Sequence, residues 1–369
     1  MKIYLKDNVY EAALKRIRYI FDEFDTVIVN ISGGKDSTVV LELAIMVAKE
    51  RGRLPQLVMF IDQEAEWDAT IQQVRSIMSR REVNPIWLQV PFKIFNATSN
   101  IEPWLNCWEE GKEWIREKEK ISIKENVYGT DRFAELFEGY TKYHYPNQKV
   151  ARIAGVRCEE SPGRMMGLTT GATYKHITWG RVEDKKIGHF TFYPIYDWSY
   201  TDVWKAIHDN NWAYCKLYDY MYQYGIKTRD MRVSNIHHET AVKTLFYLQE
   251  IESETWNKVT KRISGLNMAK HLKDGMLMPK ELPFMFNSWR EYRDHLLENL
   301  IEDEKIKATF RDQFESFEKR FHKVMHDQLC KVQISCILVN DYFLTKLSNF
   351  QASNARYLVG GSKLKGKNV

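Results

Sequence analysis

The chain has 369 residues, with 54 basic and 49 acidic side chains, a net charge of +5 and a hydrophobic content of 44%. This length allows one large domain or two smaller ones, and the composition is typical of a soluble globular protein. The small charge excess gives no general reason to expect nucleic-acid binding. No long uncharged apolar run predicts a membrane span, and the mixed charges of residues 1–25 exclude a secretory signal.

The chain has five cysteines, and no two of them have the spacing of a zinc ribbon or an iron–sulfur site. The absence of paired spacing also argues against a disulfide framework and fits a reducing cytoplasm. We therefore expect a cytoplasmic protein without zinc or an iron–sulfur cluster. The five are Cys107, Cys158, Cys215, Cys330 and Cys336.

The first ninety residues alternate between helical and extended patterns. Apolar residues at helical spacing predict helices, and short apolar runs rich in β-branched residues predict strands. Such alternation is typical of βαβ units, so we expect an α/β fold with a doubly wound, mainly parallel sheet. The predicted order is a helix at 10–24, a strand at 27–31, a helix at 37–51, a strand at 57–61, a helix at 67–80 and a strand at 86–90.

A Gly-Gly loop joins the first predicted strand to the next helix, in the stretch Ser32-Gly33-Gly34-Lys35-Asp36-Ser37-Thr38. The glycines permit positive φ and close approach to a ligand. The amides and the dipole of the following helix favour an anion. Hydroxyl groups on Ser32, Ser37 and Thr38 add donors, and Lys35 adds a cation, so the predicted ligand is a pyrophosphate group. The adjacent glycines distinguish this loop from the G-x-x-x-x-G-K-[ST] and G-x-G-x-x-G loops.

A cluster of carboxylates, Asp62, Glu64 and Glu66, follows the second predicted strand. Ligands of open α/β sheets bind beyond the carboxyl ends of the strands, so we expect the cluster beside the Gly-Gly loop. Its oxygens can hold Mg²⁺ next to a triphosphate or contact a ribose. The alternative is a solvated acidic helix N-terminus. We select Asp62 as a binding residue and, together with Asp36, as a magnesium ligand.

Residues 96–145 interrupt the alternation with three tryptophans and a charged run. They indicate an inserted segment that either sets substrate specificity or has only a solvated charged face. An apolar strand is then predicted at 150–157, where Gly155 and Arg157 suit a phosphate, because the planar guanidinium matches phosphate oxygens. Further on, Ser199 or Thr201 is expected to cap a helix that begins near residue 202.

The character of the chain changes after residue 224. Three basic residues, Lys227, Arg229 and Arg232, precede amphipathic helical patterns over residues 240–347. These residues leave nucleic-acid contact open as a weaker hypothesis, with the requirement that binding weaken steeply with salt. The expected division is a nucleotide-binding domain at 1–235, a helical C-terminal domain at 236–350 and a flexible basic tail at 351–369.

Three of these motifs, in this order, resemble the superfamily of the N-type ATP pyrophosphatases and the phosphoadenosine phosphosulfate (PAPS) reductases. The Ser32–Ser37 loop is similar to the PP-loop of that superfamily. Gly155–Ser161 is similar to the second phosphate-contacting motif of sulfate adenylyltransferase small subunits, and Pro194–Trp204 resembles the segment that closes that domain. The resemblance covers roughly residues 10–240, an ordinary domain size. It implies an adenine nucleotide α-hydrolase-like fold that binds ATP or an adenylyl sulfate.

The chain departs from the reductases at its C-terminal end. Reductases resemble one another in a Glu-Cys-Gly-x-His segment whose cysteine attacks the sulfur, and this chain has no such segment. Thiol-dependent PAPS reduction is therefore disfavoured. The order of motifs and the helical C-terminal region are most similar to a PAPS reductase-like branch that includes immunoglobulin-binding regulator proteins. That branch is related to DNA-phosphorothioation proteins, and the resemblance implies a ParB-like protein partner.

ATP-using members of the superfamily split the α–β bond of ATP and release pyrophosphate. The resemblance thus implies adenylyl transfer in a pathway of sulfur or nucleic-acid modification, with Lys35 and Arg157 as catalytic residues and Mg²⁺ as the ion. The alternative is a regulatory protein that senses ATP or an adenylyl sulfate without turnover.

Overall fold

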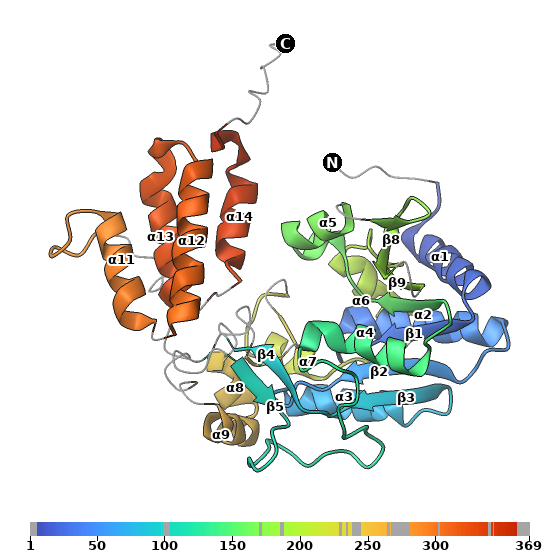
Figure 1. Ribbon diagram of the computed structural model, residues 1–369. Helices are drawn as coiled ribbons and strands as arrows, with labels where there is room; N and C mark the ends of the chain where they lie inside the picture. The colour runs from blue at the N-terminus through green and yellow to red at the C-terminus, as the bar shows by residue number, and fades with distance from the viewer. Residues whose placement is uncertain are drawn as a thin grey trace, which may run out of the picture. The chain divides into compact units, whose positions relative to one another are not determined.

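The computed structural model divides into two compact units, which are described separately (Figure 1). The first comprises Met1–Ile94, Leu105–Ile236 and Tyr247–Arg262, and the second comprises Phe95–Trp104, His237–Phe246 and Ile263–Val369. A segment from the C-terminal half of the sequence therefore belongs to the first unit. The structure describes residues 6–96, 98, 104–169, 172–184, 188–228, 231–233, 235–237, 245–263, 266, 281–301, 303–338, 341 and 343–359.

A seven-stranded sheet is the centre of the first unit. Its strands are β1 (Thr26–Asn30), β2 (Gln56–Ile61), β3 (Val83–Leu88), β6 (Val150–Ala154), β7 (Thr173–Tyr174), β8 (Ile177–Asp184) and β9 (His189–Phe192). They lie in the order β3-β2-β1-β6-β9-β8-β7. The first five in this order are parallel, and β8 and β7 are antiparallel. The predicted doubly wound, mainly parallel sheet is confirmed.

Helices precede, connect and follow these strands. They are α1 (Val9–Glu23), α2 (Lys35–Glu50), α3 (Asp68–Met78), α4 (Phe133–His144), the 3₁₀ turn η1 (Cys158–Glu160), α5 (Pro162–Thr169), α6 (Tyr200–Asp209), α7 (Leu217–Gln223), α8 (Leu245–Ile251) and α9 (Ser253–Arg262). Two further strands, β4 (Phe92–Phe95) and β5 (Trp104–Cys107), pair with each other in a separate small sheet. The predicted inserted segment thus includes β5 and the helix α4.

Helices cover both faces of the main sheet. One hydrophobic core joins α1, α2, α3 and α6 with alternate strand residues such as Val27, Val29 and Phe60. This alternation is expected because successive strand residues point to opposite faces. On the other face, Phe137 of α4 lies 5.1 Å from the guanidinium of Arg152 on β6, and α4 also hydrogen-bonds to β9. The sheet is therefore a buried middle layer, and its strand ends are left for ligands.

Two helix starts are set by local residues. The helix α2 begins at Lys35, two residues before the predicted start, with Gly34 as its N-cap. The helix α6 begins at Tyr200, and Ser199 is its cap. The Ser199 hydroxyl accepts a hydrogen bond from the amide of Asp202, whose carboxylate accepts one from the amide of Ser199. This reciprocal capping box explains why Ser199, rather than Thr201, is the cap.

The second unit is helical, as predicted for the C-terminal region. Its helices pack around buried phenylalanines that include Phe310, Phe314 and Phe317. Helical structure continues to Tyr357, inside the predicted tail, and residues 360–369 of that tail lie outside the described residues. No helix in the described part of the chain is long and apolar enough to cross a membrane. The elements are α11 (Trp289–Leu300), α12 (Glu304–Arg320), η4 (Lys323–Met325), α13 (His326–Leu338), α14 (Thr345–Ser353) and η5 (Ala355–Tyr357).

Candidate nucleotide site

The Gly-Gly loop lies where the strand order of the sheet reverses. Strand β1 pairs with β2 on one side and with β6 on the other, and Asn30 of β1 is in register with Ala154 of β6. The loops that follow β1 and β6 therefore leave the same edge of the sheet as neighbours. This switch point is the usual ligand position in open α/β sheets.

The loop is folded by its own side chains. Gly33 has a φ of +73°, a conformation that favours glycine, and a Cβ atom there would lie 2.6 Å from Cγ2 of Thr70. The hydroxyls of Ser37 and Thr38 donate to the carbonyl oxygen of Gly34 at 2.9 and 3.0 Å. The amide of Ser32 donates to the Ser37 hydroxyl at 3.2 Å. The Ser37 and Thr38 hydroxyls, predicted as phosphate donors, thus each donate their single proton to the loop itself.

The loop after β6 packs directly on the first turn of α2. A Cβ atom on Gly155 would lie 2.7 Å from the carbonyl group of Asp36 and from the amide nitrogen of Ser37, so only glycine fits there. Two residues later, Arg157 is 4% exposed and donates through Nε to Oδ1 of Asp36. Its Nη1 lies 3.6 Å from Oε2 of Glu159. The structure thus brings together the Gly-Gly loop, Gly155 and Arg157.

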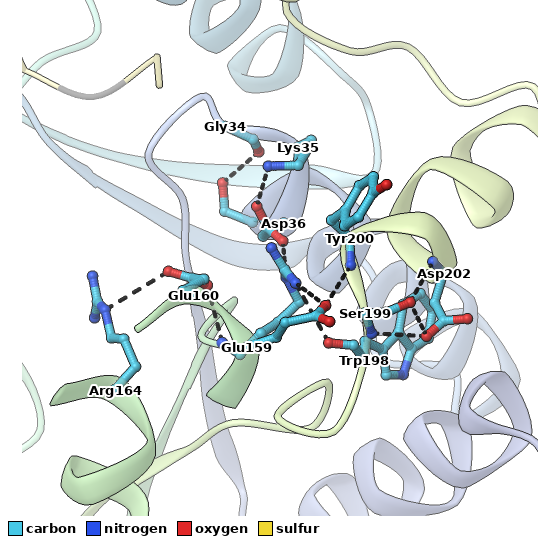
Figure 2. Close-up of polar contacts among 12 residues, drawn as sticks. Gly34, Lys35, Asp36, Glu159, Glu160, Arg164, Trp198, Ser199, Tyr200 and Asp202 are labelled. Carbon is cyan, nitrogen blue, oxygen red and sulfur yellow. Dashed lines mark hydrogen bonds and ion pairs between the residues drawn. The ribbon is translucent and has the colours of Figure 1, made fainter. Parts of the chain in front are cut away.

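Asp36 lies between the two predicted phosphate-binding cations. Its Oδ2 accepts a hydrogen bond from Nζ of Lys35 at 3.0 Å, and its Oδ1 accepts the bond from Arg157. Figure 2 shows this chain of ion pairs, with Lys35, Asp36 and Glu159 labelled. Lys35 pairs with Asp36, and Arg157 pairs with both Asp36 and Glu159. The site therefore combines a helix N-terminus with a lysine and an arginine whose charges are shared with a carboxylate. Such a cradle suits a phosphate group.

The Asp62 carboxylate is committed to protein partners. Asp62 is fully buried, and its Oδ2 accepts hydrogen bonds from Trp87 Nε1 and Gln89 Nε2, each at 2.9 Å. Its Oδ1 accepts from the Glu64 amide at 3.0 Å and from the guanidinium of Arg116. A carboxylate has about four acceptor positions, so Asp62 has none left for an ion or a ribose. These contacts favour a structural role over the predicted ligand role.

The two neighbouring glutamates are buried as well. Glu64 binds the guanidinium of Arg262, with Nε to Oε1 at 2.8 Å, and accepts a hydrogen bond from the Trp108 amide at 2.6 Å. Burial and the nearby Asp62 raise the pKa of Glu66 well above its ordinary value. The cluster is therefore not a solvated helix N-terminus, and arginines offset its charge.

The donor set does not fit a resident magnesium ion. Asp36 and Asp62, the predicted ligands, both bind basic side chains. Among the described residues, no group of three or more histidine, cysteine, aspartate or glutamate side chains is arranged to hold a metal.

The segment Pro194–Trp204, called the closing segment, connects helix α1 to the site. Asp197 accepts two hydrogen bonds from the guanidinium of Arg16, at 2.7 and 2.8 Å, and the Trp198 indole donates to the carbonyl oxygen of Val9 at 3.0 Å. The carbonyl oxygen of Trp198 also accepts a hydrogen bond from Arg157 at 3.4 Å. The segment therefore positions Arg157 and α1.

Three residues that contact the Gly-Gly loop or the carboxylate cluster were not predicted from the sequence: Arg116, Tyr218 and Arg262. Arg262 meets Glu64 across 198 residues of sequence, and Arg116 comes from the charged run of the inserted segment. The amide of Lys35 donates to the Tyr218 hydroxyl at 3.2 Å. No local pattern in the sequence marks these pairs. Of the basic residues predicted as nucleic-acid contacts, Lys227 is exposed and Arg229 lies outside the described residues.

All five cysteines are free thiols. Burial raises the pKa of each, to about 11 for Cys215 and Cys330. Cys158, which follows Arg157 directly, is the only one that is not fully buried. A raised pKa keeps a thiol protonated at neutral pH, and the thiolate is the nucleophile.

A family model described as the phosphoadenosine phosphosulfate reductase domain matches residues 26–224. The chain belongs to this family. The match contains the Gly-Gly loop, Gly155, Arg157 and the closing segment, so the predicted superfamily is confirmed. A second family model, described as a domain of unknown function (DUF3440), matches residues 225–356.

Two curated relatives are similar in sequence. The uncharacterized protein YbdN of Escherichia coli K12 is 27% identical over 415 residues, which cover 99% of this chain and 96% of YbdN. The uncharacterized protein MJ0973 of Methanocaldococcus jannaschii is 27% identical over 220 residues, which cover 57% of this chain and 44% of that protein. The first similarity includes both units of this chain, and the second spans less than half of its relative.

Among solved structures, FMN adenylyltransferase from Candida glabrata, in complex with FAD and inorganic pyrophosphate, overlaps with a TM-score of 0.37 at 16% identity. The overlap covers 59% of this chain and 64% of that one. PAPS reductase from Candida auris, as a phosphate complex, overlaps with a TM-score of 0.34 at 14% identity, over 64% of this chain and 99% of that one. Overlaps this weak say nothing about the ligand or the reaction of this chain.

Proposed function

We propose that this protein binds ATP on the Ser32–Ser37 loop and splits its α–β bond, with adenylyl transfer to an acceptor and release of pyrophosphate. The observation that carries the proposal is the packing of Gly155 on the first turn of α2, which brings Arg157 to the Gly-Gly loop. Lys35 and Arg157 both bind the Asp36 carboxylate at the N-terminus of α2. Two cations beside a helix N-terminus suit a pyrophosphate leaving group.

The reaction needs few protein groups. An acceptor oxygen attacks the α-phosphorus, the bond from that phosphorus to the bridging oxygen breaks, and the electron pair leaves with pyrophosphate. An anionic acceptor needs no general base. Lys35 and Arg157 stabilise the negative charge that grows on the departing β,γ-phosphates, which is preorganised electrostatic catalysis. Asp36 has to share both cations with the nucleotide, because it binds both of them.

The test is product analysis with ATP, either with water as acceptor or with a panel of carboxylate and phosphate acceptors. We expect AMP or an adenylate together with pyrophosphate. Release of orthophosphate instead would exclude α–β cleavage. Lys35→Ala and Arg157→Ala should each reduce pyrophosphate release by about 100-fold or more. Lys205→Ala is the matched control, because Lys205 is an exposed lysine that pairs with Asp209 on α6.

A second candidate is a protein that senses ATP or an adenylyl sulfate without turnover. Asp36 and Glu159 already pair with the two cations, and the thiol next to Arg157 has a raised pKa, which disfavours thiol-dependent PAPS reduction. Binding calorimetry together with the product analysis separates the two candidates. Tight nucleotide binding by the wild type, with equal absence of turnover in the wild type and Lys35→Ala, supports sensing.

A further inference from the structure

Tyr218 is a buried tyrosine that faces the Gly-Gly loop from the short helix α7. It is 5% exposed, and its hydroxyl accepts a hydrogen bond from the Lys35 amide at 3.2 Å. Its ring centroid lies 5.2 Å from Nζ of Lys35, within the range of a cation–π contact. A Cβ atom on Gly34 would lie 3.5 Å from the same hydroxyl. Tyr218 therefore contacts the loop at its backbone and at its lysine.

The hydroxyl of Tyr218 still has a proton to donate. A tyrosine hydroxyl has one donor and can also accept, and the Lys35 amide occupies an acceptor position. Within the described part of the chain, no residue accepts a hydrogen bond from the Tyr218 hydroxyl. Burial, followed by the nearby Asp36, raises the pKa of Tyr218, so the group stays protonated at all ordinary pH values. A permanent neutral donor thus lies at the loop.

We propose that the hydroxyl of Tyr218 donates a hydrogen bond to the β- or γ-phosphate of the nucleotide bound on the Ser32–Ser37 loop, while its oxygen holds the Lys35 amide. The inference deepens the proposed function and rests on it. Tyr218 contributes to recognition of the pyrophosphate part of the ligand, and inorganic pyrophosphate is the smallest ligand that tests it. The adenosine part lies outside this contact, so AMP is not affected.

The test uses the full-length protein and compares Tyr218→Phe with the wild type. Phenylalanine keeps the ring against Lys35 and removes only the hydroxyl. Calorimetry should show that affinity for ATP and for inorganic pyrophosphate falls roughly 10- to 100-fold, the loss expected for a hydrogen bond to a charged group. Affinity for AMP should be unchanged. Tyr220→Phe is the matched control, because Tyr220 lies on the same helix and is 43% exposed.

Each other outcome overturns the inference in a different way. If the wild type binds neither ATP nor pyrophosphate, the proposed function fails and the inference fails with it. If the wild type binds both and Tyr218→Phe binds them equally well, only the inference fails. If Tyr218→Phe loses ATP and AMP affinity to the same extent and its melting temperature falls, Tyr218 has a structural role and does not contact the phosphates.

Discussion

Arg157 donates a hydrogen bond from Nε to Oδ1 of Asp36, which joins the loop after β6 to the first turn of α2. The two residues lie 121 positions apart in the sequence. Since Lys35 binds the other oxygen of the same carboxylate, one acidic residue connects both cations of the candidate phosphate site.

Asp36→Asn should strengthen the binding of inorganic pyrophosphate when divalent ions are removed with EDTA. The substitution keeps the size of the side chain and removes a negative charge that repels the ligand and competes for Lys35 and Arg157. We expect a gain in affinity of roughly tenfold by calorimetry. Asp209→Asn, an exposed substitution on α6, is the control. Weaker pyrophosphate binding by Asp36→Asn under these conditions would contradict the competition between carboxylate and phosphate.

Gly155→Ala should destabilise the protein and weaken nucleotide binding, because there is no space for a side chain between the loop after β6 and α2. The new methyl group would lie 2.7 Å from backbone atoms of Asp36 and Ser37, so the loop after β6 has to move away from α2. Overpacking of this kind costs about 1–3 kcal/mol in the free energy of unfolding. Nucleotide affinity should fall as well, because Arg157 moves with the loop.

The control for this prediction is Gly163→Ala, where the nearest atom to a new Cβ is the Ser161 hydroxyl oxygen at 3.8 Å. Chemical denaturation and calorimetry measure the two variants side by side. Equal behaviour of Gly155→Ala and Gly163→Ala would show that the close approach of Gly155 to α2 does not matter.

Asp62→Ala should destabilise the protein, because it removes the carboxylate that pairs with Arg116 and accepts from two buried side-chain donors, on Trp87 and Gln89. Removal of one partner of a buried ion pair typically costs about 3–5 kcal/mol. Denaturation followed by tryptophan fluorescence measures the free energy of unfolding. Asp25→Asn, at an exposed position, should change it by less than about 0.5 kcal/mol. Wild-type stability of Asp62→Ala with loss of nucleotide binding would instead support the ligand role predicted from the sequence.

Glu66→Gln should stabilise the protein at high pH. Burial and Asp62 raise the pKa of Glu66 above its ordinary value of 4.5, although Arg116 opposes the shift. Above pH 4.5 the unfolded chain loses a proton from Glu66 that the folded protein keeps. The free energy of unfolding therefore falls as the pH rises, until the pKa of the folded state is reached. Glutamine has the shape of the protonated side chain and does not titrate.

The measurement is the difference in unfolding free energy between Glu66→Gln and the wild type across a pH series. We expect this difference to be small near pH 4 and to favour the variant increasingly toward pH 8. A difference that does not depend on pH would mean that Glu66 titrates with the same pKa in the folded and unfolded chain.

Local residue patterns were enough to predict the order of helices and strands and the loops that lie together at one edge of the sheet. The alternation of helices and strands followed from apolar periodicity, because each element has to bury one face or stripe. The proximity of the Gly-Gly loop, Gly155 and Arg157 followed from short motifs at the ends of predicted strands, because parallel strands bring such ends to one edge. The helix start at Lys35 was missed by two residues, since Gly34 rather than a residue with a capping side chain is the N-cap.

Only the tertiary structure decided the partners of the buried charges. Asp62 and Glu64 are residue types that commonly bind a metal ion or a ribose. In the structure, however, Arg116 pairs with Asp62 from 54 residues away, and Arg262 pairs with Glu64 from 198 residues away. The same holds for Tyr218, whose hydroxyl reaches the Lys35 amide across 183 residues. Whether a carboxylate is free to bind a ligand depends on which distant side chains the tertiary fold brings to it. Local sequence patterns do not predict these contacts.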